Sequence, residues 1–158
     1  MSFHDITVPA GTRYVRFALF DDFTDGNDDL DLVIYRQSGT SYVLVGSTGG
    51  ATSNEVFSII NPTAAVYRVF IHGFETDGPD ANYTLFHWIV PEAAAGNLTV
   101  SAPSTVTEGN AYTVTGGWSG LTPGRKYLGT LTHHRLAAPV PAGSPRIGHT
   151  SVFIDVPQ

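Results

Sequence analysis

The stretch RFALFDDFTDGNDDLDLVIY (residues 16–35) places two apolar segments on either side of an acidic turn. Alternating apolar side chains precede the turn at Phe17 and Leu19, and at Val15 directly before the stretch, and follow it at Leu30, Leu32 and Ile34. Alternation with a period of two puts such side chains on one face of a β-strand. The stretch therefore predicts two strands, each with one face toward a core.

The first ninety residues repeat this pattern. Strands are predicted at residues 13–20, 29–35, 41–46, 54–60, 66–72 and 82–90. Clusters of Gly, Pro, Asn and Ser separate them, and no segment has a convincing helical period. Short strands at this spacing predict an all-β, antiparallel β-sandwich.

A second module is predicted after residue 95. Residues 1–95 carry 12 Asp or Glu and 4 Lys or Arg, a net charge of −8, whereas residues 96–158 carry 2 and 4, a net charge of +2. Further strands are predicted at 98–102, 111–118, 126–133 and 150–156, with a Pro- and Gly-rich loop at 135–149. We therefore predict a β-sandwich at 1–92 and a small β module at 96–158, with a short linker between them.

The small module is near the lower size limit for independent folding. The strand predicted at 82–90 is apolar on both faces, so it needs cover on both. Its two faces carry Tyr83, Leu85 and Ile89 on one side and Phe86, Trp88 and Val90 on the other. The second cover is either the small module or the first sandwich itself, and both alternatives remain open.

Composition excludes several classes of function. The chain has no cysteine, which excludes disulfides and thiol chemistry. The acidic front half argues against nucleic acid, because phosphates require Lys and Arg. No apolar run approaches the length of a membrane span. With 42% hydrophobic residues, the chain has enough apolar side chains for a core.

Three segments together resemble the bacterial pre-peptidase C-terminal domain. They are residues 16–35, IINPTAAVYRVFIHGF (59–74) and DANYTLFHWIV (80–90). That family has a D-L-D-L-x-x-Y strand after an acidic turn, then an Asn-Pro turn and a Y-x-V-x-V-x-G-F strand. The resemblance implies a jelly-roll-like β-sandwich. Such a domain lies C-terminal to the catalytic domain of secreted peptidases and is not itself a peptidase.

The second module contains WSGLTPGRKYLGTLTH (118–133). Its L-x-P-G-x-x-Y part, with Leu121, Pro123, Gly124 and Tyr127, looks like the tyrosine corner of fibronectin type III and immunoglobulin-like sandwiches. The two modules in this order look like the C-terminal end of secreted subtilisin-like serine proteases. This resemblance implies a secreted, non-catalytic accessory region that serves stability, secretion or substrate and surface binding. Its first partner would be the parent protease catalytic domain.

The residues themselves predict no enzymatic activity. The segment GTS (39–41) runs into a predicted strand rather than a nucleophile helix, and His72 lies in a predicted strand. The six histidines lack the spacing of a zinc motif. The opening MSFHDITVPAG has neither the basic flank nor the apolar run of a signal peptide. It therefore reads as the start of a fragment, and secretion is implied by the resemblance alone.

An alternative from another class is a free-standing secreted module that binds a carbohydrate or a protein. Such a module needs exposed aromatic side chains in a row on one sheet face. The candidates are Tyr35, Tyr42, Tyr67 and Phe70, with core burial expected for at least Tyr67 or Phe70.

The acidic turn is a candidate calcium site. Calcium takes about six to eight oxygen ligands, and the turn offers Asp21, Asp25, Asn27, Asp28, Asp29 and Asp31. If every connection reverses the chain, loops 21–28, 47–53 and 74–81 emerge at one end of the sandwich, which adds Asp77 and Asp80. Aspartate and asparagine are also ordinary turn formers. A calcium site and a solvated acidic turn both remain open.

Overall fold

The prediction of an all-β chain with antiparallel sheets is confirmed. A computed structural model describes residues 1–94, 97–134 and 146–158, and every strand pair within them is antiparallel. The only helical element there is a 3-10 turn, η1 (Asp21–Phe23), so no described helix has the length and apolarity of a membrane span. The strands are β1 (Ser2–Val8), β2 (Thr12–Ala18), β3 (Asp29–Ser38), β4 (Ser41–Thr48), β5 (Val56–Ile60), β6 (Ala65–Glu75), β7 (Phe86–Pro91), β8 (Leu98–Ser101), β9 (Thr115–Trp118), β10 (Lys126–His134) and β11 (Arg146–Asp155).

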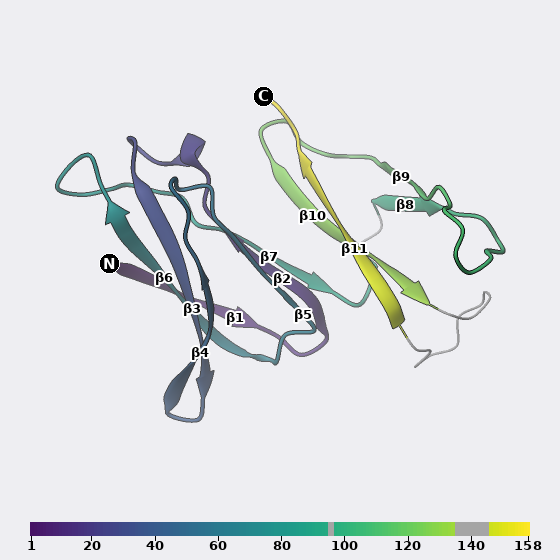
Figure 1. The fold of residues 1–158 in the computed structure, drawn as a ribbon, viewed down its shortest axis with the longest axis horizontal. Coiled ribbons are helices and arrows are strands. Elements are labelled where there is room, and N and C mark those ends of the chain that lie inside the picture. The colour runs from purple at the N-terminus through teal and green to yellow at the C-terminus, as the bar shows by residue number, and fades with distance from the viewer. Residues whose placement is uncertain (95–96, 135–145) are drawn as a thin grey trace. The chain divides into compact units, whose positions relative to one another are not determined.

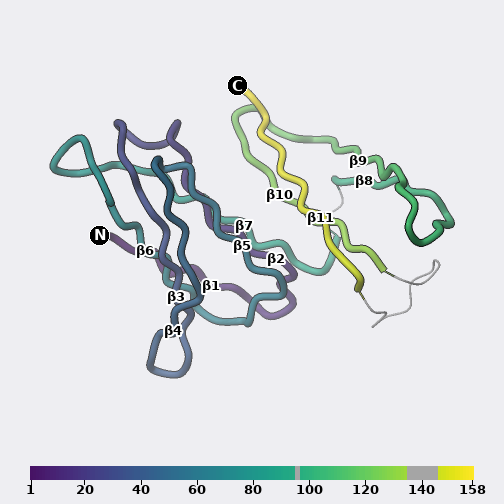
Figure 2. The backbone as a smooth tube through the Cα atoms, viewed as in Figure 1, coloured from purple at the N-terminus to yellow at the C-terminus, as the bar shows by residue number. Residues whose placement is uncertain are grey.

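The chain divides into two compact units, Met1–Glu92 and Ala93–Gln158 (Figures 1 and 2). The first unit contains a four-stranded sheet in the order β1-β6-β3-β4 and a three-stranded sheet in the order β5-β2-β7. In the second unit, β8 pairs with β9 and β10 pairs with β11.

The core of the first unit lies between its two sheets. The predicted apolar faces of β2 and β3 are both buried, and β6 adds three more core residues. These core side chains are Val15, Phe17 and Leu19, then Leu30, Leu32 and Ile34, then Tyr67, Val69 and Ile71, and none is more than 2% exposed. Burying one such aliphatic or aromatic side chain contributes about 1.5–3 kcal/mol. The two sheets therefore stabilise each other as a sandwich.

The N-terminal strand β1 is absent from the sequence-based prediction. It pairs with β6 along the edge of the four-stranded sheet, from Ser2 opposite Ile71 to Val8 opposite Ala65. Only Val8 of this strand is buried. An edge strand with one core residue has too weak an apolar pattern to be found by periodicity.

The strand β7 starts later than predicted. Tyr83 makes only an isolated bridge with Thr24, and regular pairing begins at Phe86. Of the two apolar faces named from the sequence, the one with Tyr83, Leu85 and Ile89 packs against the core. On the other face, the ring of Phe86 stacks on that of Trp88, with centroids 5.9 Å apart.

The second unit differs from the prediction at two boundaries. The strand predicted at 111–118 is limited to β9, and β11 begins at Arg146, so residues 146–149 of the predicted loop are strand. The rest of that loop, residues 135–145, lies outside the described residues. The backbone N–H of Thr122 donates to the hydroxyl of Tyr127 at 3.0 Å. This is the contact expected of a tyrosine corner.

Candidate functional site

The two acidic loops, 21–28 and 74–81, meet at one end of the first unit, as the reversal of chain direction at each connection predicts. The carboxylate of Asp25 accepts hydrogen bonds from the backbone N–H of Asn82 at 2.7 Å and from its side-chain amide at 2.5 Å. In return, the carboxylate of Asp77 accepts from the backbone N–H of Asn27 at 2.9 Å. Each loop therefore supplies a carboxylate that satisfies donors on the other loop.

The close approach of these loops depends on Gly26. A Cβ at this position would lie 2.5 Å from both carboxylate oxygens of Asp77. Real Cβ contacts are not this short, so any other residue would push the carboxylate away. Glycine at this position lets the backbone of one loop lie against the side chain of the other.

A buried serine in the loop 47–53 bonds this loop to the acidic loop 21–28. The hydroxyl of Ser53 donates to the carbonyl of Asp28 at 2.7 Å and accepts from the backbone N–H of Leu30 at 3.1 Å. The side chain of Ser53 is fully buried. The next residue, Asn54, donates its side-chain amide to the carboxylate of Asp21 at 2.5 Å. All three loops are thus joined by direct hydrogen bonds.

Some carboxylates at this end are stabilised in their charged form and others are not. The hydrogen bonds from Asn82 lower the pKa of Asp25. Burial raises the pKa of Asp29, and the negative charge of Asp31 nearby raises it further. Burial also raises the pKa of Glu55, which is only 6% exposed and lies near Asp31. The acidic end therefore contains carboxyl groups with opposite preferences for a proton.

Two carboxylate oxygens at this end are buried without a hydrogen-bond partner. They are Oδ2 of Asp28 and Oδ1 of Asp29. The other oxygen of Asp28 accepts a long hydrogen bond from the backbone N–H of Asp77 at 3.3 Å. Unpaired buried oxygens of this kind are destabilising unless a cation or water reaches them.

The structure brings most of the predicted calcium ligands to one end but not into one cage. Among the described residues, no three Asp, Glu or His side chains converge on a position for a metal ion. Asp21, Asp25 and Asp77 direct oxygens at protein donors instead, and Asp80 is exposed. A calcium site at this end stays a prediction from the sequence.

A second candidate surface is the outer face of the four-stranded sheet. The register places Phe3 opposite Phe70 and Tyr35 opposite Arg68 on this face. The ring centroid of Phe70 lies 5.6 Å from that of Phe3 and 5.6 Å from that of Tyr35. We call Phe3, Tyr35, Tyr42 and Phe70 the outer aromatic face. Tyr67 is buried in the core, as the sequence allowed.

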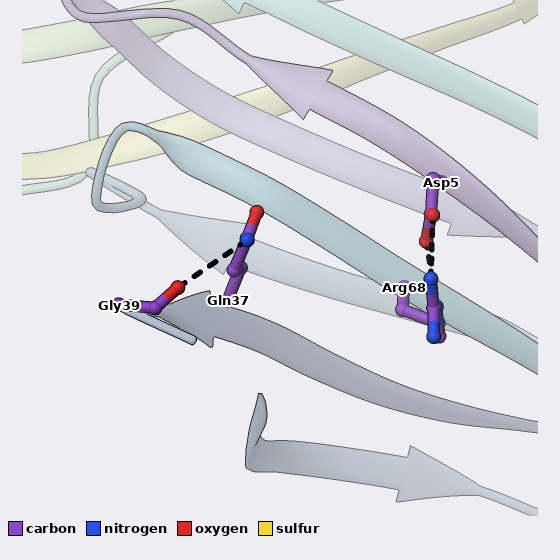
Figure 3. A network of polar contacts seen from close by, with 4 residues as sticks. All are labelled: Asp5, Gln37, Gly39 and Arg68. Atoms are coloured by element: carbon purple, nitrogen blue, oxygen red, sulfur yellow. Dashed lines mark hydrogen bonds and ion pairs between the residues drawn. The ribbon is translucent and has the colours of Figure 1, made fainter. Parts of the chain in front are cut away.

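An ion pair crosses the outer aromatic face (Figure 3). The guanidinium of Arg68 donates to both carboxylate oxygens of Asp5, at 2.8 and 2.7 Å. It also lies 4.2 Å from the ring centroid of Phe3 and 4.4 Å from that of Tyr42. The hydrogen bonds from Arg68 lower the pKa of Asp5. The rings and the ion pair therefore hold one another in place.

Three of the described histidines contact side chains elsewhere in the fold. The Nε2 atom of His4 lies 2.9 Å from the hydroxyl of Tyr83, and that of His133 lies 3.0 Å from the hydroxyl of Thr150. The Nδ1 atom of His72 lies 3.6 Å from the carboxylate of Asp31. The last two contacts join β10 to β11 and β6 to β3.

Sequence reasoning missed the residues that hold the acidic loops together. Ser53, Asn54 and Asn82 supply the donors, and Phe3 completes the outer aromatic face. Serine and asparagine in turns are a known signal for side-chain to backbone bonds. That signal does not identify a partner about 30 or 60 residues away in sequence, which depends on the fold.

Comparisons with known proteins give no relative from which a role could be transferred. No protein-family model matches the chain, no curated protein matches its sequence, and no solved structure matches its fold.

Proposed function

We propose that this chain is the non-catalytic C-terminal accessory region of a secreted subtilisin-like serine protease. The observation that carries the proposal is the place of the quoted motifs in the fold. The D-L-D-L-x-x-Y segment lies in β3. The segment YRVFIHGF (67–74), with Ile71 at the second Val of the Y-x-V-x-V-x-G-F pattern, lies in β6, which pairs with β3. Asn61, in the Asn-Pro turn before β6, has a left-handed φ of 49°. The motifs thus form the central strand pair of the four-stranded sheet and the turn that leads from β5 into β6.

The construction of the first unit supports a stabilising role. Its core lies between two sheets, and its loops are tied by hydrogen bonds without any cysteine. Such a module keeps its fold whatever the redox state of its surroundings. In this proposal the two units belong to the exported enzyme, outside its catalytic domain, and stabilise it or contact its substrate.

The reading frame upstream of Met1 in the source genome tests the proposal. We expect it to encode a serine protease domain that carries the Asp, His and Ser motifs and is preceded by a signal peptide. The purified 158-residue chain should release no fragments from casein above the buffer rate. Inhibitor-sensitive turnover by the chain alone would contradict the proposal, as would a stop codon directly upstream.

The alternative, a free-standing secreted module that binds carbohydrate or protein, is favoured by the outer aromatic face. Rings of this kind contact the apolar faces of sugars or side chains. Depletion of the protein by an insoluble polysaccharide or a fibrous protein tests this role. Phe70→Ala should abolish such binding, whereas Phe74→Ala, at a side chain that is 68% exposed, serves as the control.

A further inference from the structure

Two histidines of the first unit lie on edge strands of different sheets. His4 is on β1, at one edge of the four-stranded sheet, and His87 is on β7, at one edge of the three-stranded sheet. His4 lies opposite Val69 and His87 lies opposite Phe17, and both of these partners are core residues. Because residues directly opposite in antiparallel strands share a face, each histidine is on the core-facing side of its sheet. We call His4 and His87 the histidine seam.

The surroundings of the histidine seam favour the uncharged form of the rings. The other titratable group at the seam is Tyr83, whose hydroxyl lies 2.9 Å from Nε2 of His4. The strand β7 has no acidic residue, and the one carboxylate of β1, that of Asp5, is bound by Arg68 on the outer face. Burial of part of the ring lowers the pKa of His87, and the charge of His4 lowers it further. The two rings are therefore close enough for a charge on one to disfavour a charge on the other.

The end of β1 that carries His4 is its weakly held end. Residues 2–5 are all exposed, and Val8, the buried side chain of this strand, lies at the other end. Apart from the pairing with β6, the exposed end is held by the contacts of Tyr83 with His4 and with the hydroxyl of Ser2, and by the ion pair of Asp5. Contacts of this kind at the surface add little stability. Local opening of residues 2–5 therefore requires less free energy than unfolding of the whole unit.

We propose that mildly acidic pH loosens residues 2–5 of β1 from β6 by placing a positive charge on both histidines of the seam. Two like charges then repel each other between the sheets, and opening of this end returns both rings to water. Because His87 binds a proton less readily in the closed form, acid favours the open form. The loosening should begin near pH 6.5, the ordinary pKa of histidine, and be complete below the lowered pKa of His87. The inference is independent of the role proposed above.

Amide hydrogen exchange of the full chain, corrected for the pH dependence of the chemical exchange rate, tests this proposal. We expect the protection of the bonded amides in residues 2–5 to fall at least about threefold between about pH 7.5 and pH 5, relative to the amides between β3 and β6. The β3–β6 reference is needed because carboxyl groups of the acidic end change the stability of the whole unit with pH. An unchanged relative protection overturns the proposal. So does a His87 ring that titrates at or above pH 6.5 in an NMR titration of the same chain.

A matched pair of variants identifies the responsible group. His87→Gln keeps a polar side chain that cannot become charged, so residues 2–5 should be protected equally at both pH values. The His87 side chain reaches solvent, so this substitution should preserve the fold. His133→Gln is the control, because His133 lies on β10 of the second unit, and this variant should keep the loss of protection in acid. A loss that persists in His87→Gln, or that His133→Gln also removes, overturns the proposal.

Discussion

The two units are built from the same kind of strand, yet they bury very different amounts of apolar surface. Residues 1–92 contain all twelve buried hydrophobic residues of the described chain, and no described residue of 93–158 is buried. In the first unit, strands of up to eleven residues form two sheets with a shared core. In the second, β8 and β9 have four residues each. Alternation in the sequence thus predicts strands. Whether their apolar side chains are buried depends on a second sheet long enough to cover them.

The largest difference between the two units is expected when each is expressed as a separate fragment. We expect residues 1–92 alone to keep a well-dispersed amide NMR spectrum, because they contain their own core. Residues 93–158 alone should give a narrow spectrum, because isolated two-stranded sheets are at best marginally stable in water. A well-dispersed spectrum from the second fragment would show that it folds without a buried core of the usual kind.

Truncating one leucine in each unit gives the next largest effect. Leu32 in β3 is fully buried, so Leu32→Ala should lower the free energy of unfolding by about 2–5 kcal/mol. Leu131 in β10 is partly exposed, and Leu131→Ala should cost about 1 kcal/mol or less. Urea unfolding of both variants measures the difference. Equal losses would mean that the second unit is packed as tightly as the first.

Removing the hydroxyl of Ser53, which bonds two loops together, should cause a smaller loss in the free energy of unfolding. Ser53→Ala leaves the carbonyl of Asp28 and the N–H of Leu30 without their buried partner, which should cost about 1–3 kcal/mol. Ser151→Ala, at an exposed position of β11, should change stability by less than about 0.5 kcal/mol. The same urea titrations measure both values. A neutral Ser53→Ala would mean that water replaces the hydroxyl.

The shifted pKa values of four carboxyl groups in the first unit should make its stability depend on pH in two opposite steps. Groups with a raised pKa bind protons more readily when folded, so Glu55 and Asp29 should increase stability as the pH falls from 7 toward their ordinary range. Asp5 and Asp25 have a lowered pKa, so stability should fall again below about pH 4.

Thermal melts between pH 3 and 7 test this dependence. Glu55→Gln should raise stability at pH 7 by about 1 kcal/mol or less and flatten the curve above about pH 5. Asp22→Asn, at an exposed position of η1, is the control and should keep the shape of the parent curve. An unchanged curve for Glu55→Gln would assign the dependence to other groups.

Calcium gives the smallest expected effect. A site filled at ten times its dissociation constant would stabilise the fold by about 1.4 kcal/mol, or roughly 3–6 °C in melting temperature. We expect a smaller rise, because Asp25 and Asp77 already accept backbone N–H donors. Melts in calcium, magnesium and chelator measure it. A full calcium-specific rise that Asp25→Ala and Asp29→Ala both remove would establish the calcium site predicted from the sequence.

The core strands could be predicted because their alternation is regular. Leu30, Leu32 and Ile34 all face the core because β3 lies in the middle of its sheet, where one whole face is covered. The convergence of the acidic loops could also be predicted, since it follows from chain reversal alone. These features depend on local pattern and strand direction, and both can be read from a single sequence.

The remaining features depend on long-range contacts. The edge strand β1 has Val8 as its only buried residue, and its place beside β6 is fixed by pairing between residues 57 to 69 positions apart in the sequence. The match of Asp25 with Asn82 requires both loops to be in position first. In the sequence, the buried residue Ser53 cannot be told from an ordinary serine in a turn. Its role follows from the space between the loops.

The reciprocal bonds between the acidic loops have a consequence for local motion. The amide hydrogens of Asn27, Leu30 and Asn82 are all held by side chains of another loop. Hydrogen exchange at these amides therefore requires the loops to separate, in contrast to exchange in an ordinary surface turn. Proteases also need an extended, detached segment. The most charged part of the surface should accordingly be cut more slowly than its composition indicates.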